Sequence, residues 1–533
     1  MNKYSLTALS VCGGVLSGLA WTEWCPGLIL LFSFVPFFII ENLLYENRRR
    51  YSPNACFLYL LPGFVIFSIL TLGWIRAISM TAAICVILIA ALLMAFTMWL
   101  AHRIRLREGD LQGYMSIIAF WLTLEFLCLR IPVLSPWLNL GNGLSKDILF
   151  IQWYEVTGTA GGTLWILLSN LFLFRLLVSL FTKNRKRFLY LSVWLIIILI
   201  PSIISVIRYR TISPSSGYEE EVVIVQPNFD PYEEKYTVPF EKQLEKVISM
   251  AEPVVSDNTD WLVTPETTID DPADENMLTD NKYVKMIRDF IEKRPSVSVV
   301  TGIVSFSSTS HGTIIGSSSD TRSYYNSALK IDTGAIVEIY HKSKLVPGFE
   351  FIPSKGFFWL ISRFLPELGG LNRGYSTQDA RTCFENTDKS KKIAPVICYE
   401  SVFGEYITDY IRDGAGAIFI ITNDGWWKNT IGYKQHLTYS SLRAIETRRP
   451  VIRSANTGIS CFIDIRGKII QKTEWWTPSV IKGTFNYEDR ITPYVRFGDY
   501  LLYMACVISI LILGVIFVFR PFRNKTKMFN KVV

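Results

Sequence analysis

The segment Ile393-Ala-Pro-Val-Ile-Cys398-Tyr-Glu400 is an apolar run that ends in a cysteine, an aromatic ring and a carboxylate. It lies between a lysine-rich turn at residues 389–392 and Gly404, which is the pattern of a buried strand. Cys398 is therefore expected at the carboxyl edge of a strand, where open α/β sheets place their chemistry. The competing interpretation is a small core residue, because free Cys is among the most buried residue types.

Two other apolar, strand-like runs also end in reactive side chains. Glu266 follows Trp261-Leu-Val-Thr-Pro, and Lys342 follows Ile339-Tyr-His. A carboxylate, an ammonium group and a thiol are thus predicted at comparable ends of three strands. An ordinary thiol is only a few per cent thiolate at neutral pH, so Cys398 needs a proton acceptor, which Glu266 supplies. Lys342 supplies a cation for the oxyanion that forms when a thiolate attacks an ester or amide carbonyl.

The composition indicates a membrane protein. Half of the 533 residues are hydrophobic, 14% are aromatic, and the mean hydropathy of +0.28 is high for a soluble enzyme. Eight apolar stretches are each close to the length that crosses a hydrocarbon core of about 30 Å. The first is expected to be retained, because no small-residue cleavage site follows it. The predicted spans are residues 6–20, 28–44, 56–75, 82–101, 115–129, 163–181, 188–207 and 500–519.

The distribution of Lys and Arg predicts the orientation of these spans. If the spans alternate, the basic clusters fall on one side, and the short loops of the other side hold only Arg76, Arg130 and Lys146. The positive-inside rule then places both termini in the cytoplasm. The net charge of +8 is concentrated in those cytoplasmic loops and the tail, so we do not expect nucleic-acid binding. Three segments follow: a seven-span membrane domain, an outward-facing domain, and an eighth span with a basic tail, at residues 1–207, 208–496 and 497–533.

The outward-facing segment alternates strand-like runs with helix-like stretches, which predicts a layered α/β domain. No zinc-type Cys/His spacing occurs and the chain has four His, so no metal site is expected. The sequence also allows a disulfide between Cys383 and Cys461. The expected strands are 221–226, 261–264, 297–306, 325–331, 335–340, 394–398, 417–422, 451–454, 460–465 and 480–485, and the expected helices are 240–251, 281–293, 405–413 and 435–448.

The order Glu-Lys-Cys resembles the nitrilase superfamily, and with the spans the sequence is similar to the apolipoprotein N-acyltransferases of bacteria over nearly its whole length. The resemblance implies a polytopic α-helical membrane domain of about eight spans and a nitrilase-like αββα sandwich. The matching pieces are Val225-Gln-Pro-Asn228, Tyr325-Asn-Ser327, Leu345-Val-Pro347, Cys398-Tyr-Glu400, Thr422-Asn-Asp-Gly-Trp426, Gln435-His436, Arg443-Ala-Ile-Glu446, Trp121-Leu-Thr-Leu-Glu125 and Pro136-Trp137.

The same resemblance implies a two-step acyl transfer without a cofactor. Cys398 takes an acyl chain from a membrane phospholipid as a thioester, and the α-amino group of a diacylglyceryl-cysteine on an apolipoprotein then receives it. Glu266 serves as base in both steps, and Lys342 holds the oxyanion. The implied location is the bacterial inner membrane, with the catalytic domain in the periplasm, and the protein is expected to be a monomer.

Further site residues follow from the family pattern. Supporting roles are implied for Glu350, Glu400, Tyr399 and Asn326, and substrate-binding roles for Trp426, Tyr236 and Phe349. Two departures are present. The family order Phe-Gly-Glu is Gly348-Phe349-Glu350 here, which keeps the spacing to the carboxylate, and a Lys-Trp pair is replaced by Lys235-Tyr236.

Several alternatives stay open. Lys344 competes with Lys342 as the catalytic lysine, and Glu125 has either a hydrogen-bonding role inside the bundle or a lipid-headgroup role. For His436 we expect a capping or core role, and residues 355–375 are a candidate lid. A membrane-tethered amidase with the same triad is the alternative function. A catalytically idle scaffold or transporter is the alternative of a different class.

Overall fold

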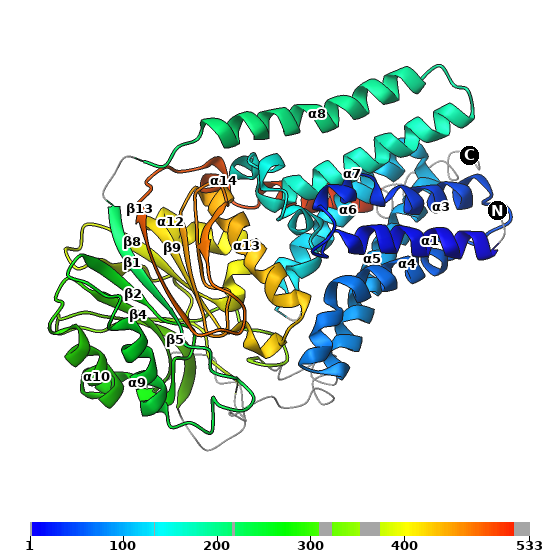
Figure 1. Cartoon of the computed structure of the whole chain (residues 1–533). Helices are drawn as coiled ribbons and strands as arrows, with labels where there is room; N and C mark the ends of the chain where they lie inside the picture. The colour runs from blue at the N-terminus through cyan, green and yellow to red at the C-terminus, as the bar shows by residue number, and fades with distance from the viewer. Residues whose placement is uncertain (1–2, 133, 216–218, 309–321, 352–373, 516–533) are drawn as a thin grey trace, which may run out of the picture.

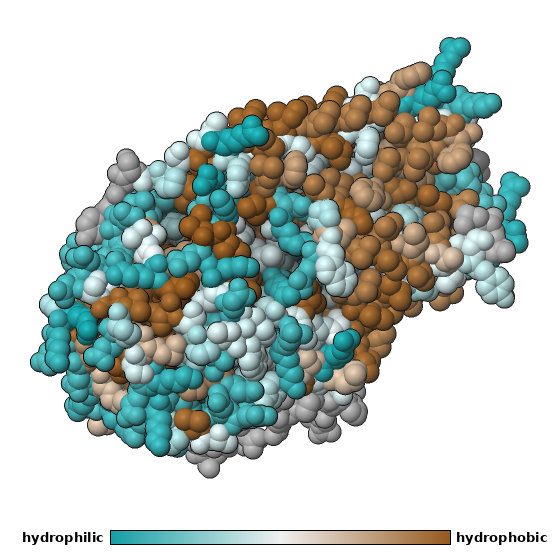
Figure 2. Space-filling model, viewed as in Figure 1, coloured by the Kyte–Doolittle hydropathy of each residue, from teal (hydrophilic) through white to brown (hydrophobic). Residues whose placement is uncertain are grey.

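Apolar helices and a two-sheet sandwich occupy opposite halves of the molecule (Figure 1). The computed structural model describes residues 3–132, 134–215, 219–308, 322–351 and 374–515. On the face shown in Figure 2, hydrophobic residues cover most of the helical half, and hydrophilic residues dominate the sandwich half. This division is the one expected of a chain that is partly embedded in a bilayer and partly exposed to water.

Each predicted span coincides with a helix or helical segment. Within the described ranges, six segments are long and apolar enough to cross a membrane, and helices α1 and α15 are described over 17 and 15 residues. The polytopic helical domain expected from the sequence is therefore present. The helices are α1 (Lys3–Leu19), α2 (Leu30–Ser33), α3 (Val35–Glu46), α4 (Ala55–Leu72), α5 (Met80–Glu108), α6 (Asp110–Arg130), α7 (Tyr154–Phe181), α8 (Arg187–Thr211) and α15 (Tyr500–Gly514).

Small residues allow a close contact between α1 and α4. A side chain added at Gly14 of α1 would lie 2.1 Å from the backbone oxygen of Gly63 in α4, so the two backbones touch. The Ser10 hydroxyl also accepts a hydrogen bond from the Gly63 N–H at 2.9 Å. Such contacts stabilise helix pairs in lipid, where apolar burial alone provides no preference. By contrast, α8 packs mainly on α7 and forms one edge of the bundle (Figure 1), with 6% of its most apolar stretch buried.

The sandwich consists of two mixed sheets. In spatial order, the first sheet contains β13 (Ser479–Asn486), β1 (Glu219–Gln226), β2 (Thr259–Val263), β4 (Ser298–Ser307), β5 (Ser323–Ile331) and β6 (Glu338–His341), with β3 (Ile269–Asp274) paired to β4. The second contains β12 (Ile469–Lys472), β11 (Cys461–Ile463), β10 (Val451–Ala455), β9 (Ala415–Thr422), β8 (Lys392–Ile397) and β7 (Phe384–Glu385). The central strands β1, β2 and β4 are parallel, as are β8, β9 and β10, so their carboxyl ends meet at one edge of each sheet.

Successive side chains of β1 point to opposite faces of the first sheet, and this shows how the layers form. Val222 and Ile224 pack into the core shared by the two sheets, whereas Val223 and Val225 pack towards α9 (Phe240–Ala251) and α10 (Lys282–Ile291). On the second sheet, α12 (Gly404–Arg412) packs against β8 and β9, and α13 (Ile431–Thr447) packs against β10 and β11. The order of layers is helix, sheet, sheet, helix.

The helix α13 also joins the sandwich to the membrane bundle. It packs against α7, and the Gln435 side chain of α13 accepts a hydrogen bond from the Trp137 indole at 2.7 Å. The Tyr439 hydroxyl accepts one from the Trp21 indole at 3.1 Å. The buried residues of the bundle and of the second sheet therefore form one continuous hydrophobic core. This continuity holds one edge of the sandwich against the helix ends.

Most predicted elements are confirmed, and three short strands were missed. All ten expected strands overlap observed ones, and the helix expected at 240–251 matches α9. The missed strands are β3, β7 and β12; β3 contains the Asp-Asp-Pro sequence, which is atypical of a strand. Cys383 and Cys461 are free thiols. Cys383 directly precedes β7, at one edge of the second sheet, and Cys461 begins β11, next to the opposite edge. The candidate lid at 355–375 falls almost entirely outside the described residues.

Candidate active site

The three reactive side chains come from the ends of three strands in both sheets. Glu266 lies three residues beyond the end of β2, Lys342 follows the last residue of β6, and Cys398 begins a short 3₁₀ helix, η7 (Cys398–Val402), directly after β8. The Lys342 Nζ atom lies 2.8 Å from Glu266 Oε1. Cys398 interacts electrostatically with both charged groups. The fold thus brings together residues separated by more than 130 positions in sequence.

Lys342 is held between two carboxylates. Its Nζ atom donates to Glu266 Oε1 and to Glu350 Oε1, each at 2.8 Å, and its side chain is 1% exposed. The Asn326 amide bridges the same two carboxylates, with distances of 2.8 and 3.0 Å from Nδ2. The other Glu266 oxygen accepts the Asn423 N–H at 3.0 Å. Every charge at this site is therefore paired and fixed in direction, as buried charges must be.

Burial and charge pairing set the protonation states of the resting site. Burial raises the pKa of Cys398 well above its usual value, and the nearby Glu266 charge raises that pKa further. Burial also opposes the charged forms of Glu266 and Lys342, but their ion pair overcomes it. The pKa of Glu266 is lowered and the pKa of Lys342 is raised. The resting site therefore holds a carboxylate, an ammonium group and a neutral thiol.

These protonation states constrain how the Cys398 thiol can react with a carbonyl group. A stabilised carboxylate is a weak base and a buried thiol is a weak acid, so a free thiolate is disfavoured in the empty site. Proton transfer from Cys398 to Glu266 becomes favourable when the sulfur attacks a carbonyl and negative charge moves to an oxyanion near Lys342. The arrangement is suited to concerted acyl transfer.

Glu400 organises the turn that carries Cys398. Its carboxylate is fully buried and accepts the N–H groups of Ile397 at 2.8 Å and Ser343 at 2.7 Å. The hydroxyls of Tyr340 and Tyr406 donate to the same carboxylate at 2.6 and 2.9 Å. Since these donors come from β6, the segment after β6, the end of β8 and α12, Glu400 ties the cysteine turn to the lysine segment.

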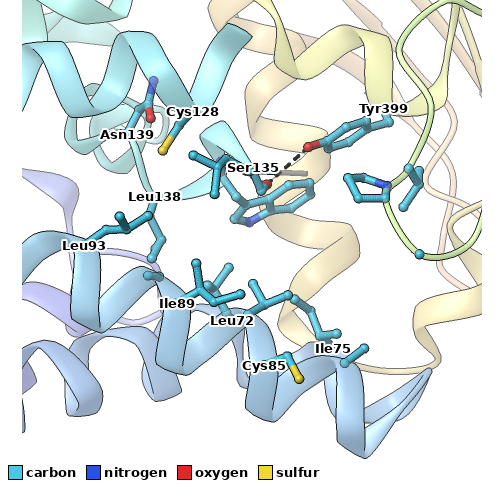
Figure 3. Close-up of a pocket in the computed structure, with 18 of the residues that line it drawn as sticks. Leu72, Ile75, Cys85, Ile89, Leu93, Cys128, Ser135, Leu138, Asn139 and Tyr399 are labelled. Carbon is cyan, nitrogen blue, oxygen red and sulfur yellow. Dashed lines mark hydrogen bonds between the residues drawn. The ribbon is translucent and has the colours of Figure 1, made fainter. Parts of the chain in front are cut away.

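An apolar cavity of about 210 Å³ lies beside this turn, between α5, α6 and the segment Val346–Phe349 (Figure 3). Tyr399, the residue after the nucleophile, forms part of its wall and donates a hydrogen bond to the Ser135 hydroxyl at 3.2 Å. Leu93, Ile89 and Cys85 of α5 form the opposite side (Figure 3). The cavity thus leads from the sandwich edge into the membrane helices.

Three tryptophans from distant segments form an aromatic wall of the cavity. Trp74, Trp137 and Trp427 have ring centroids 5.0–5.9 Å apart. The sequence analysis singled out Trp426 and Pro136-Trp137, but it named neither Trp74 nor Trp427 and did not place these rings together. Glu125 also borders the cavity. Its carboxylate accepts the Leu140 N–H and the Thr163 hydroxyl, each at 2.8 Å, which is the hydrogen-bonding arrangement inside the bundle.

The predicted substrate-binding residues separate into two groups. Phe349 lines the cavity, whereas Tyr236 and Trp426 are absent from its lining. Tyr236 is 53% exposed, and Trp426 packs edge-to-face on Tyr232 at 5.4 Å. Both flank Lys235, whose amino group lies 5.8 Å from the Trp426 ring. Both residues therefore lie next to Lys235 and outside the lining of the apolar cavity.

The competing residues take other positions. The Lys344 amino group lies over the rings of Phe403 and Tyr406, at 5.2 and 5.5 Å, so Lys342 is the lysine paired with Glu266. His436 is fully buried on α13 and is a core residue, not a cap. Among the described residues, no three His, Cys, Asp or Glu side chains group as a metal site would require.

The fold and this site define a class: a membrane-embedded αββα protein in which a buried cysteine lies beside a paired carboxylate and lysine. Two family descriptions match the sequence, Carbon-nitrogen hydrolase over residues 222–491 and Apolipoprotein N-acyltransferase N-terminal domain over residues 13–172. The chain belongs to the apolipoprotein N-acyltransferase family within the carbon-nitrogen hydrolases.

Two apolipoprotein N-acyltransferases agree with this assignment. The apolipoprotein N-acyltransferase of Chlorobaculum tepidum is 25% identical over 509 residues, covering 92% of each chain. That of Rhizobium rhizogenes is 30% identical over 394 residues, covering 72% of this chain and 69% of the relative. Among solved structures, a Saccharomyces cerevisiae member of branch 10 of the nitrilase superfamily is 16% identical, covers 53% of this chain and 94% of its own, and has a TM-score of 0.37.

Proposed function

We propose that the protein transfers an acyl chain from a membrane phospholipid to the α-amino group of the N-terminal diacylglyceryl-cysteine of apolipoproteins. Cys398 carries the acyl chain between donor and acceptor as a thioester. One observation supports this above all: Tyr399, the residue next to Cys398, and residues 346–349, which follow Lys342 in sequence, line an apolar cavity that extends between membrane helices. A hydrolase of small, soluble amides has no need of such a cavity.

In the first half-reaction, the Cys398 sulfur attacks the ester carbonyl of the phospholipid while its proton passes to Glu266. Lys342 stabilises the oxyanion of the tetrahedral intermediate, a contribution of about 3–4 kcal/mol for one well-placed donor. The intermediate collapses by breaking the bond to the glycerol oxygen. That oxygen takes the proton from Glu266, so lysophospholipid leaves and the carboxylate is restored.

In the second half-reaction, the neutral α-amino group of the acceptor attacks the thioester carbonyl. Glu266 removes a proton from the attacking nitrogen, and Lys342 again stabilises the oxyanion. Collapse of this intermediate breaks the carbon–sulfur bond. The thiolate of Cys398 recovers its proton from Glu266, and the product is an amide at the lipoprotein amino terminus.

The position of the cavity fits a donor that stays in the bilayer. Moving an acyl chain into water costs about 0.8 kcal/mol per CH₂ group, so the site must open within or next to the membrane. One side of α5 lines the cavity with Ile89 and Leu93. On its outer side, Leu88 and Leu92 are 46% and 44% exposed. A chain in the outer part of the bilayer thus reaches the cavity past a single helix.

We further propose the topology predicted from the charge distribution. Residues 1–207 and 497–533 form the membrane part, residues 208–496 form a periplasmic catalytic domain, and the protein acts as a monomer in the bacterial inner membrane. The basic loops support this orientation by the positive-inside rule. A membrane-impermeant maleimide tests it on a Glu252→Cys variant, since Glu252 is exposed on the sandwich. Labelling only after permeabilisation of the inner membrane would contradict the orientation.

The acyl-enzyme itself provides the decisive experiment. Purified protein is incubated with a phospholipid of defined acyl chain and examined by intact mass spectrometry. We expect a mass increase of one acyl group, its absence in Cys398→Ala, and its discharge by a diacylglyceryl peptide. Turnover by a protein whose Cys398 never becomes acylated would refute the thioester. Rapid discharge to free fatty acid without peptide would instead favour the hydrolase.

A further inference from the structure

A second buried polar chain lies behind the nucleophile, separate from Glu266 and Lys342. It runs from Arg453 on β10 to Asp424, just after β9, and to His436 on α13, and all three side chains are 0% exposed. The Arg453 guanidinium forms an ion pair with Asp424, and Asp424 Oδ1 lies 3.1 Å from His436 Nδ1. Burying a cation, an anion and an imidazole together is costly unless each has a fixed partner.

The chain ends at the backbone of Cys398. His436 Nε2 lies 3.2 Å from the Cys398 carbonyl oxygen and 2.9 Å from the Ser401 hydroxyl, which itself donates to that carbonyl at 2.7 Å. A carbonyl only accepts hydrogen bonds, so His436 Nε2 carries the hydrogen on this side. Two donors from different elements thus hold one carbonyl, and that carbonyl belongs to the nucleophile.

The backbone of Cys398 needs this restraint. Its φ angle is +50°, in the left-handed region that residues with a side chain rarely adopt. Such conformations persist only where the surroundings determine them, and they gather at catalytic sites. Glu400 fixes the N–H of the preceding residue, Ile397, at 2.8 Å. The His436 contact fixes the carbonyl of Cys398 itself, so the backbone is held at the Ile397 N–H before the strained residue and at the carbonyl that follows its φ angle.

The same imidazole supports the wall of the apolar cavity. Its ring lies 6.1 Å from the Trp137 ring in a stacked arrangement and 5.2 Å from the Trp427 ring edge-to-face. Both tryptophans line the cavity. His436 therefore contacts the nucleophile's backbone on one side and the cavity wall on the other. A residue with only a packing role in the helix would need neither polar endpoint.

We propose that His436, oriented by Asp424 and Arg453, is a positioning residue that holds the Cys398 backbone in the conformation from which its sulfur attacks the acyl donor. The proposal rests on the proposed acyl transfer, because it names a residue that serves the same nucleophile. It assigns His436 no proton transfer to substrate.

Two nearly isosteric variants separate the two ends of the imidazole. In His436→Gln, the side-chain amide nitrogen takes the place of Nε2 and keeps a donor for the Cys398 carbonyl. In His436→Asn, the amide nitrogen takes the place of Nδ1 and keeps only the Asp424 contact. We measure acyl-enzyme formation in a single turnover by intact mass spectrometry, at several phospholipid concentrations, together with the thermal unfolding midpoint of each variant.

We expect His436→Asn to slow acyl-enzyme formation by about tenfold to hundredfold, as misplacement of a reacting group does. The half-saturating phospholipid concentration should stay within about twofold, since ground-state binding is not removed. His436→Gln should recover most of the lost rate. A structural role alone predicts that both variants lose activity in step with stability. That result, or an unchanged rate in His436→Asn, would overturn the proposal.

Two controls keep the outcome interpretable. If His436→Asn does not fold, Ser401→Ala removes the other donor to the same carbonyl, and it should slow acylation without changing half-saturation; an unchanged rate would overturn the proposal. The unmodified protein tests the underlying function. No acyl adduct on its Cys398 refutes the thioester itself, whereas an adduct that forms equally fast in His436→Asn refutes only the positioning role.

Discussion

Replacement of Lys342 by Met separates the two contributions of the buried lysine. Its Nζ atom lies 2.8 Å from a carboxylate oxygen of both Glu266 and Glu350, and the side chain is 1% exposed. Lys342→Met keeps the length of the side chain but leaves two buried carboxylates facing each other without a cation. Removing one partner of a buried ion pair costs about 3–5 kcal/mol, so the free energy of unfolding should fall by this amount.

The catalytic loss has a different origin. Without the cation, the oxyanion loses a donor worth about 3–4 kcal/mol, which slows acyl-enzyme formation by about 10²–10³-fold. The pKa of Glu266, which Lys342 holds low, should also rise, so that less carboxylate is present to accept the thiol proton. Both effects act on the acylation rate, and only the uncompensated charge acts on stability.

The double variant Lys342→Met/Glu350→Gln provides the matched control. Glu350→Gln removes one of the two stranded charges while leaving the oxyanion without its cation. We expect stability to return towards that of the unmodified protein and the acylation rate to stay low. Thermal unfolding and single-turnover mass spectrometry measure the two quantities on the same samples. Acyl-enzyme formation in Lys342→Met within about tenfold of the unmodified rate would refute the role given to Lys342.

Three further predictions concern the surroundings of the site. Leu93→Trp fills the cavity and should slow acylation by long acyl chains more than by short ones, because each CH₂ group excluded from the cavity costs about 0.8 kcal/mol. Leu92→Trp, on the lipid side of α5, is the control. Equal effects of the two variants would contradict the proposal that the cavity holds the acyl chain. Burial raises the pKa of Asp424, but the Arg453 charge outweighs it and lowers that pKa from 3.8 to about 2. A lowered native-state pKa contributes stability above the unfolded pKa, so about 2 kcal/mol should be lost as pH falls from about 4 towards 2. Asp424→Asn should reduce this loss of unfolding free energy between about pH 4 and about pH 2, measured by unfolding at several pH values. An unchanged loss would show that another group causes it. Glu125→Ala leaves the Thr163 hydroxyl and the Leu140 N–H without an acceptor. The free energy of unfolding should fall by about 1–3 kcal/mol, and the thermal unfolding midpoint should fall with it. A midpoint equal to that of the unmodified protein would show that water replaces the carboxylate.

The positions of Glu266, Lys342 and Cys398 could be predicted because each depends on a local signal. An apolar β-type run followed by a polar residue marks the end of a strand, and parallel strands place such ends at a common edge. Hydrophobic length likewise located the long apolar helices of the described residues. For Glu350, the preserved spacing to Leu345-Val-Pro347 indicated that its carboxylate reaches the lysine, and the two groups lie 2.8 Å apart.

The direction in which an aromatic side chain points could not be predicted from the sequence. Trp426 and Trp427 are neighbours of the same type, yet Trp427 lines the cavity and Trp426 packs on Tyr232 outside it. Both lie in one 3₁₀ turn, where successive side chains point in different directions, so residue type carries no information on which ring faces the lipid. The exposed position of Tyr236 was unpredictable for the same reason.

The sequence by itself determined which stretches enter the bilayer, which form strands, and which three side chains stand at the strand ends, because hydrophobic length and period are properties of neighbouring residues. Only the tertiary structure decided that Trp74, Trp137 and Trp427 share a wall and that Arg453, Asp424 and His436 reach the back of Cys398. Those contacts join segments far apart in the chain, and their geometry depends on how two sheets and a helix bundle pack, which no local pattern records.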